Sequence, residues 1–203
     1  MHIVDGALSG PIVAAGALLS AGGIALGLRA MTLDRIPAAG VLAASFFVAS
    51  LIHVPVGPSS VHLILNGLAG LVLGWAAFPA LFVGLVLQAV FFGFGGVTVL
   101  GINTLAIALP AVLIGAALRP LIAGAGPARA AVLGGLGGAG ALALTGVVIA
   151  AALALTGAGF VPAAKLVLVA HLPVMVIEGL LTAAAVGLLQ RVRPDLFTAL
   201  ATS

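Results

Sequence analysis

Seven long apolar stretches, separated by short segments that carry proline, glycine or charge, dominate this sequence. Each stretch is close to the roughly 20 residues that an α-helix needs to cross a bilayer. Only 5% of the residues are charged, whereas soluble domains contain about 25%. We therefore predict an all-α integral membrane protein, a bundle of about seven transmembrane helices. The predicted spans are residues 8–29, 36–52, 60–77, 80–96, 103–119, 130–155 and 166–190.

The few basic residues fall on one side of this predicted bundle. With the N-terminus outside, Lys165 faces outward, and the cytoplasmic side receives Arg29, Arg35, Arg119, Arg129, Arg191 and Arg193. Cytoplasmic loops of membrane proteins carry the excess of Lys and Arg. We therefore expect the N-terminus outside, the C-terminus in the cytoplasm, and a multi-pass protein of the cell membrane (inner or plasma membrane). The net charge of +3 is loop charge that sets this orientation, and it predicts no nucleic-acid partner.

The first two residues, Met1 and His2, carry the most specific chemistry. We expect no cleaved targeting segment, because a signal peptide begins with a basic region and this chain begins MHIVDG. A free Met1 amine, the His2 amide and a His2 ring nitrogen can close two fused chelate rings on one ion. Three planar nitrogens with a fourth position open suit Ni(II) or Cu(II). The chain has no cysteine, so thiolate metal sites and disulfides are excluded.

The four histidines all fall near the outer ends of their predicted segments. Ionisable residues within spans are functional candidates by default. We expect an arm of residues 1–7 to fold inward and bring Met1 and His2 to His62, which would fill the fourth position. Other polar residues are candidates to hold the arm and the imidazoles by hydrogen bonds. These candidates are Asp5, His53, Asn66, Gln88, Asn103 and His171.

Several of these side chains also have a purely structural explanation. An interfacial histidine such as His53 often only caps a helix end, and His171 is equally consistent with an internal hydrogen-bond partner. Gln88 and Asn103 can simply join helices. Glu178 lies seven residues after His171, on the same face of the last span. It is either a buried anchor or part of the coupling to a partner, and the sequence leaves both open.

Stretches in order along nearly the whole chain resemble the CbiM/NikM family, the substrate-binding S-components of energy-coupling-factor (ECF) transporters for cobalt and nickel. They are MHIVDG at 1–6, SSVH at 59–62 with NGL at 66–68, QA at 88–89 with GGVTVLGIN at 95–103, and HLP at 171–173 with EG at 178–179. The resemblance implies a single S-component domain over residues 1–203. It implies a metal site made of the Met1 amine, the His2 amide and imidazole, and His62. The ion, Ni2+ or Co2+, is then the substrate, and no cofactor is bound permanently.

The resemblance also implies partners within the lipid bilayer and at its cytoplasmic face. They are a transmembrane T-component, a pair of cytoplasmic ATPase subunits and often a small accessory membrane subunit. ATP hydrolysis falls to those ATPases, because this chain has no Walker motif, and we expect a transporter subunit and not an enzyme. S-components commonly contact the T-component through small residues of helix 1. Ala17, Ala21 and Ala25 form such a stripe, for which packing inside the bundle is the alternative.

The chain departs from cobalt-type members of this family at three places, one of which is Phe94, where those members often carry a His before the Gly-Gly pair. Those members typically read Met-His-Ile-Met-Glu-Gly and Ser-His-Pro-Thr-Gly. Here Val4 and Asp5 stand in the first motif, and Leu63 and Ile64 follow His62. These departures and the planar nitrogen set favour Ni2+ over Co2+.

Three other functions fit parts of the sequence. An S-component for an organic micronutrient would need a larger pocket with aromatic walls, whereas the chain has one Trp and no Tyr. An intramembrane hydrolase would use Ser59 or Ser60 with His62, but these residues are close in sequence and no orienting carboxylate lies nearby. A purely structural subunit would leave the histidines idle.

Overall fold

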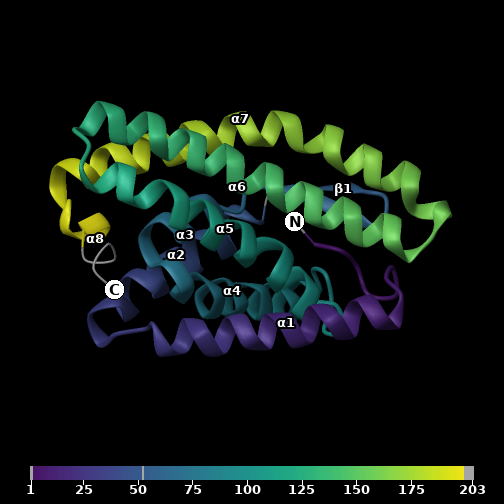
Figure 1. Cartoon of the computed structure of the whole chain (residues 1–203). Coiled ribbons are helices and arrows are strands. Elements are labelled where there is room, and N and C mark those ends of the chain that lie inside the picture. Colours follow the sequence, from purple (N-terminus) through teal and green to yellow (C-terminus); the bar gives the residue numbers. More distant parts are fainter. Residues whose placement is uncertain (1, 52, 199–203) are drawn as a thin grey trace.

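The computed structural model describes residues 2–51 and 53–198, and helices make up most of it (Figure 1). Its helices are α1 (Gly10–Arg29), α2 (Ile36–Ala49), α3 (Asn66–Leu73), α4 (Ala77–Phe92), α5 (Leu100–Ala123), α6 (Pro127–Thr156), α7 (Val161–Val192) and the short α8 (Asp195–Thr198). Three 3-10 turns, η1 (Leu33–Arg35), η2 (Gly74–Ala76) and η3 (Ala158–Phe160), connect helices. Two strands, β1 (His53–Val56) and β2 (Ser59–His62), lie between α2 and α3.

Helices α1, α6 and α7 lie on the outside of the bundle and enclose a central group. Figure 1 shows α6 and α7 as an antiparallel pair along one side and α1 along the opposite side, with α3, α4 and α5 between them. Helix α5 is central, since it contacts α1, α3, α4 and α6. Large apolar side chains point outward on the outer helices; Leu18, Leu155 and Leu180 are 76%, 77% and 67% exposed. In a soluble protein such a surface would aggregate, whereas lipid is its natural solvent.

The helices α1 to α7 confirm the predicted helical membrane class. Five segments are long and apolar enough to cross a membrane: Gly10–Arg29, Asn66–Phe92, Leu100–Ala123, Pro127–Thr156 and Ala158–Val192. Helix α2, at 14 residues, is shorter than the roughly 20 that a full span needs. The outside position of the N-terminus and the cytoplasmic position of the C-terminus stay predictions.

The structure corrects the predicted helical span over residues 60–77. Strand β2 occupies its beginning, and α3 contains only eight residues. A helix of that length is about 12 Å long, far less than a bilayer core of about 30 Å. Gly74 then adopts a φ of +58°, a conformation that glycine reaches without a steric penalty. The chain turns there into η2 and α4, so this region is a short helix followed by a second, longer one.

The β1–β2 hairpin is the second departure from the predicted all-α fold. The strands pair antiparallel, with His53 opposite His62 and Val56 opposite Ser59. Gly57, with a φ of +57°, makes the turn between them. The prolines and glycine of residues 55–58 were expected only to separate two helices. The hairpin instead places two histidines side by side and leaves the other edge of β2 available for pairing.

Helices α3 and α5 approach each other at glycine. A Cβ on Gly70 would collide with the main chain of Ala111, and one on Gly115 would collide with the main chain of Gly70. Small residues allow such close approach between membrane helices, where van der Waals packing supplies the attraction. The position of α3, which directly follows the hairpin, therefore depends on these two glycines.

We predict that Gly70→Ala lowers the thermal midpoint of the protein purified in detergent. The added methyl group must push α3 away from α5, and such overpacking costs about 1–3 kcal/mol. Gly40→Ala is the matched control, because Gly40 lies in α2 and its Cβ would meet no atom within 4 Å. Equal midpoints for the two variants would contradict the importance of this contact.

Candidate metal centre

The N-terminal arm, of which the structure describes residues 2–7, precedes α1, runs inward and ends in the middle of the bundle (Figure 1). It pairs with the free edge of β2 through a bridge between Ile3 and Ser59. The His2 carbonyl accepts hydrogen bonds from the Ser60 amide at 3.1 Å and from Ser59 Oγ at 3.0 Å. The Val4 amide donates to the Pro58 carbonyl at 3.2 Å. The arm thus pairs with the hairpin at a single bridge and three further hydrogen bonds, which fix the position of His2.

Asn103, in the first turn of α5, holds the opposite side of the arm. Its Oδ1 accepts from the Ile3 amide at 2.9 Å, and its Nδ2 donates to the Ile3 carbonyl at 3.0 Å. Ile3 is fully buried and Asn103 is 2% exposed. The Asn103 side chain therefore pairs with the main chain of the arm on the side that no strand covers.

A second clamp holds the outer part of the arm. Asp5 Oδ1 accepts hydrogen bonds from the Thr98 hydroxyl at 2.5 Å, the Thr98 amide at 3.1 Å and the Val99 amide at 3.3 Å. The Asp5 amide donates to the Gly95 carbonyl at 2.8 Å. A Cβ on Gly96 would collide with the Asp5 carboxylate. The loop before α5 thus accepts the arm because it lacks side chains at this point.

The imidazoles of His2 and His62 meet at the inner end of the arm. Each residue is 2% exposed, and the ring centroids lie 4.8 Å apart. His2 Nδ1 and His62 Nε2 face each other at 3.4 Å. Burial lowers the pKa of each histidine to about 4, because the charged imidazolium would lose its hydration. Both rings are therefore neutral in the physiological pH range.

The nitrogens of the two rings that point away from each other face carbonyl oxygens, which can only accept a hydrogen bond. His2 Nε2 donates to Gln88 Oε1, and His62 Nδ1 donates to the Leu63 carbonyl at 2.7 Å. A neutral imidazole carries one proton, so the two facing nitrogens, His2 Nδ1 and His62 Nε2, both present lone pairs. Metal-bound histidines commonly hold their second nitrogen in this way. Two convergent lone pairs without a proton between them suit a cation.

Side chains alone do not complete a metal site here. Among residues 2–51 and 53–198, no three His, Cys, Asp or Glu side chains are grouped closely enough to hold an ion. Any ion at His2 and His62 would therefore need further donors from the main chain or the N-terminus. The Met1 amine, which belongs to the predicted chelate, lies outside the residues that the structure describes.

The structure places the other predicted residues around this pair or away from it. His53 stands opposite His62 in the hairpin, with its ring against the edge of Phe94 at a centroid distance of 4.2 Å. His171 is buried in α7 and its Nδ1 donates to the Val167 carbonyl at 2.6 Å. His53 and His171 therefore lie around the facing rings of His2 and His62.

Asn66 does not reach the arm. Its Nδ2 donates to the Ile107 carbonyl at 2.9 Å and to the Thr145 hydroxyl at 3.0 Å, so it joins α3 to α5 and α6. The stripe of Ala17, Ala21 and Ala25 on α1 is exposed, whereas the inward face of α1 is made of Gly16, Ser20, Gly23 and Gly27. The stripe stays a predicted docking surface.

Sequence reasoning missed several contacts of the site. The hydroxyl groups of Ser59 and Thr98 bind the arm, and Glu178 Oε2 accepts from the Ile64 amide at 3.2 Å in the loop after β2. Glu178 is thus an anchor for the segment that follows His62. No local pattern points to these pairs, since each joins segments far apart in the sequence.

The comparisons match the chain to a cobalt-uptake family, to proteins named for metal transport, and to two similar folds. The model of a family described as the cobalt uptake substrate-specific transmembrane region (CbiM) matches residues 2–196. A putative metal transport protein of Haemophilus influenzae is 44% identical over 96% of both chains. A fused nickel transport protein NikMN of Rhodobacter capsulatus is 35% identical over 60% of this chain and 37% of its own length. The fold is similar to two crystal structures of transition metal transporters, one of them truncated, with TM-scores of 0.76 and 0.72. Their identities are 24% and 23%, and the matches cover 95% and 93% of this chain and 93% and 96% of theirs.

We predict that Asn103→Ala loosens the arm. Losing both bonds to Ile3 costs about 2 kcal/mol, which corresponds to roughly thirtyfold faster exchange. Hydrogen exchange at the Val4 and Asp5 amides measures this opening, because those amides bond to Pro58 and Gly95 and not to Asn103.

Thr104→Ala is the matched control. Thr104 is also buried and is the next residue along α5, but its hydroxyl donates to Leu100 within the same helix. Unchanged exchange at Val4 and Asp5 in Asn103→Ala would show that Asn103 does not hold the arm.

Proposed function

The chain belongs to the CbiM family of cobalt uptake substrate-specific transmembrane regions, and we propose that it captures Ni2+, in preference to Co2+, with its N-terminal arm. It is a multi-pass membrane component of cobalt or nickel uptake. The proposed donors are the Met1 amine, the His2 amide and Nδ1, and His62 Nε2. The ion is substrate, taken up at this site and then released.

The facing nitrogens of His2 and His62 carry the proposal. Their separation of 3.4 Å is close to what two donors at about 2.1 Å from one ion require. The bonds to Gln88 and Leu63 leave both lone pairs free. Closing the site around an ion therefore needs only a small adjustment of the two rings.

The donor set supports nickel over cobalt. Nδ1 of His2 is the ring nitrogen that closes a six-membered chelate with the amide nitrogen of the same residue. An amine, an amide and two imidazoles form a planar set of four nitrogens, and tetragonal nitrogen sites suit Ni(II). Affinity for such sites also rises from Co2+ to Ni2+.

Release requires the arm to move, because three of the four proposed donors belong to it. The hydrogen bonds to Ser59, Asn103 and Thr98 oppose that movement, so an external source of energy is needed. We propose that partner subunits supply it: a transmembrane T-component, an ATPase pair and a small accessory membrane subunit. The fused Rhodobacter capsulatus protein, of which this chain matches 37%, supports association with further transporter subunits.

We predict that one glycine added before Met1 abolishes tight Ni2+ binding. The extension moves the terminal amine one residue away and replaces it with an amide, so the fused chelate rings cannot form. One glycine added after Ser203 is the matched control and should leave binding unchanged. Isothermal titration of Ni2+ and Co2+ into the purified protein measures both affinities.

His62→Ala should weaken Ni2+ binding without removing it, since three arm donors remain. High affinity retained in the N-terminally extended protein would exclude the chelate. A clear preference for Co2+ in the unmodified protein would overturn the nickel assignment but would not contradict the chelate.

We predict that about two protons are released per Ni2+ bound at pH 6. They come from the Met1 amine and the His2 amide, since the two imidazoles are already neutral at a pKa of about 4. Affinity therefore rises with pH across this range. Histidines with the ordinary pKa of about 6.5 would raise the count above three. Titration calorimetry in buffers of different ionisation enthalpy gives the number, and a count above three would contradict the buried, neutral pair.

A further inference from the structure

A cavity of about 720 Å³ opens where α1 and α5 finish, and none of the histidines lines it. It lies between the last turn of α1, the η2 turn and the second half of α5, and it contains three arginines: Arg29, Arg35 and Arg119. Asn103, which holds the arm, and Arg119 lie sixteen positions apart on α5, about 24 Å of helix. The cavity is therefore separate from the proposed metal centre.

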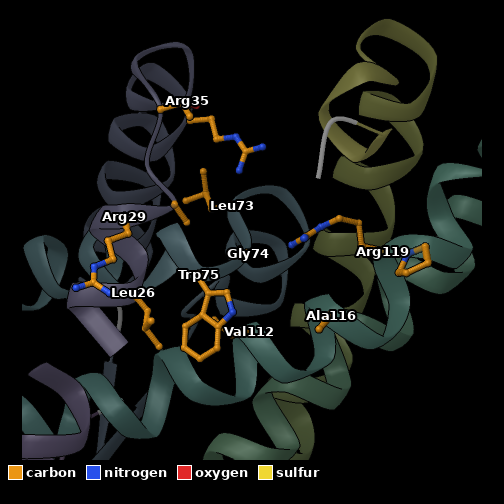
Figure 2. A pocket seen from close by; sticks show the side chains of 12 residues that line it. Leu26, Arg29, Arg35, Leu73, Gly74, Trp75, Val112, Ala116 and Arg119 are labelled. Atoms are coloured by element: carbon orange, nitrogen blue, oxygen red, sulfur yellow. The ribbon is translucent and has the colours of Figure 1, made fainter. Parts of the chain in front are cut away.

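Two of the arginines approach from opposite sides. Figure 2 shows the guanidinium groups of Arg35 and Arg119 pointing toward one another across the cavity, while Arg29 points outward at its rim. In the part of the chain that the structure describes, the ion pair found is Arg193 with Asp195. Asp34, the acid beside Arg35, is exposed and hydrogen-bonds to Thr32. Among the described residues, neither converging arginine thus has a carboxylate within ion-pair distance.

Arg119 is held in place for an anion. Its Nε donates to the Leu71 carbonyl at 2.9 Å and its Nη2 donates to the Gly70 carbonyl at 2.5 Å. Both carbonyls belong to the last turn of α3. Arg119 is 8% exposed. A Cβ on Gly74 would stand 3.1 Å from Nη2 and 3.2 Å from Nη1, so a larger residue at this position would crowd the guanidinium. A fixed arginine loses little entropy when it binds a planar or tetrahedral oxyanion.

The remaining wall is apolar and faces the lipid-exposed surface. Leu26 and Trp75 are 47% and 42% exposed, and Val112 and Ala116 continue the wall along α5 (Figure 2). Trp75 stacks on Phe78 at a centroid distance of 5.8 Å. Arginines above an apolar wall with tryptophan at its edge are the chemistry of a membrane interface.

We propose that this cavity binds the headgroup of an anionic phospholipid. The phosphate lies between Arg35 and Arg119, and the glycerol and upper acyl chain lie against Leu26 and Trp75. Basic pockets between membrane helices take such headgroups because the arginines neutralise the phosphate while the apolar wall receives the chain. An acidic segment of a partner protein would match the arginines but would gain less from the apolar wall.

The single tryptophan of the chain reports occupancy directly. Phosphatidylglycerol and phosphatidylcholine, each brominated on the acyl chain, are titrated into the full-length protein in detergent, and quenching of Trp75 emission is measured. We expect stronger quenching by phosphatidylglycerol. Arg35→Gln should weaken that preference about tenfold, the value of one charge-assisted hydrogen bond. Arg35 donates no side-chain hydrogen bond within the described residues, so this substitution leaves the fold intact.

Arg129→Gln is the matched control, since Arg129 is exposed in the first turn of α6 at the same end of the bundle and does not line the cavity. It should keep the preference. Equal quenching by both lipids, or equal loss in both variants, overturns the proposal. Displacement of brominated phosphatidylglycerol by millimolar inorganic phosphate assigns the cavity to a soluble anion and overturns the lipid assignment.

Discussion

The main chain of the N-terminal arm must find hydrogen-bond partners inside a bundle that lipid surrounds. An unpaired amide or carbonyl there costs several kcal/mol, because no bulk water replaces the missing partner. Strand β2 supplies partners on one side of the arm, and Asn103 supplies them on the other. Residues 59–62 must therefore be extended. The hairpin with β1 and the late start of α3 agree with that requirement.

The pattern of apolar residues in the sequence was sufficient to predict the long helices but not the hairpin. Residues 60–77 are as apolar as a span, and nothing local distinguishes a strand there from a helix. Besides β1, strand β2 pairs with the arm, more than fifty positions away along the chain. The gathering of His2 with His62 could be predicted, because the donor types and the depth of each segment limit the arrangements. The tautomers could not, since they depend on the Gln88 side chain and the Leu63 carbonyl.

The distribution of charge separates the two ends of the molecule. The histidine end holds neutral imidazoles, while arginines gather at the end where α1 and α5 finish. A divalent cation near arginines would be repelled, and this repulsion would be strong in a medium of low dielectric constant. Asn103, which holds the arm, and Arg119 lie sixteen positions apart on α5, about 24 Å of helix, so one small bundle keeps a cation site and a cluster of arginines apart.

One peptide group links the histidine pair to the longest helix. The carbonyl of the Leu63–Ile64 peptide accepts the proton of His62 Nδ1, and its amide donates to Glu178 Oε2 on α7. Hydrogen bonds at both ends of a peptide polarise it and strengthen each other, so Glu178 makes this carbonyl a better acceptor and His62 Nε2 a better donor to metal. The next residue, Leu65, has a φ of +50°, which is a strained backbone conformation for a residue other than glycine. Helix α7 continues to the end of the bundle where the arginines gather. A shift of that helix would therefore tilt this peptide and change the direction in which His62 Nε2 points.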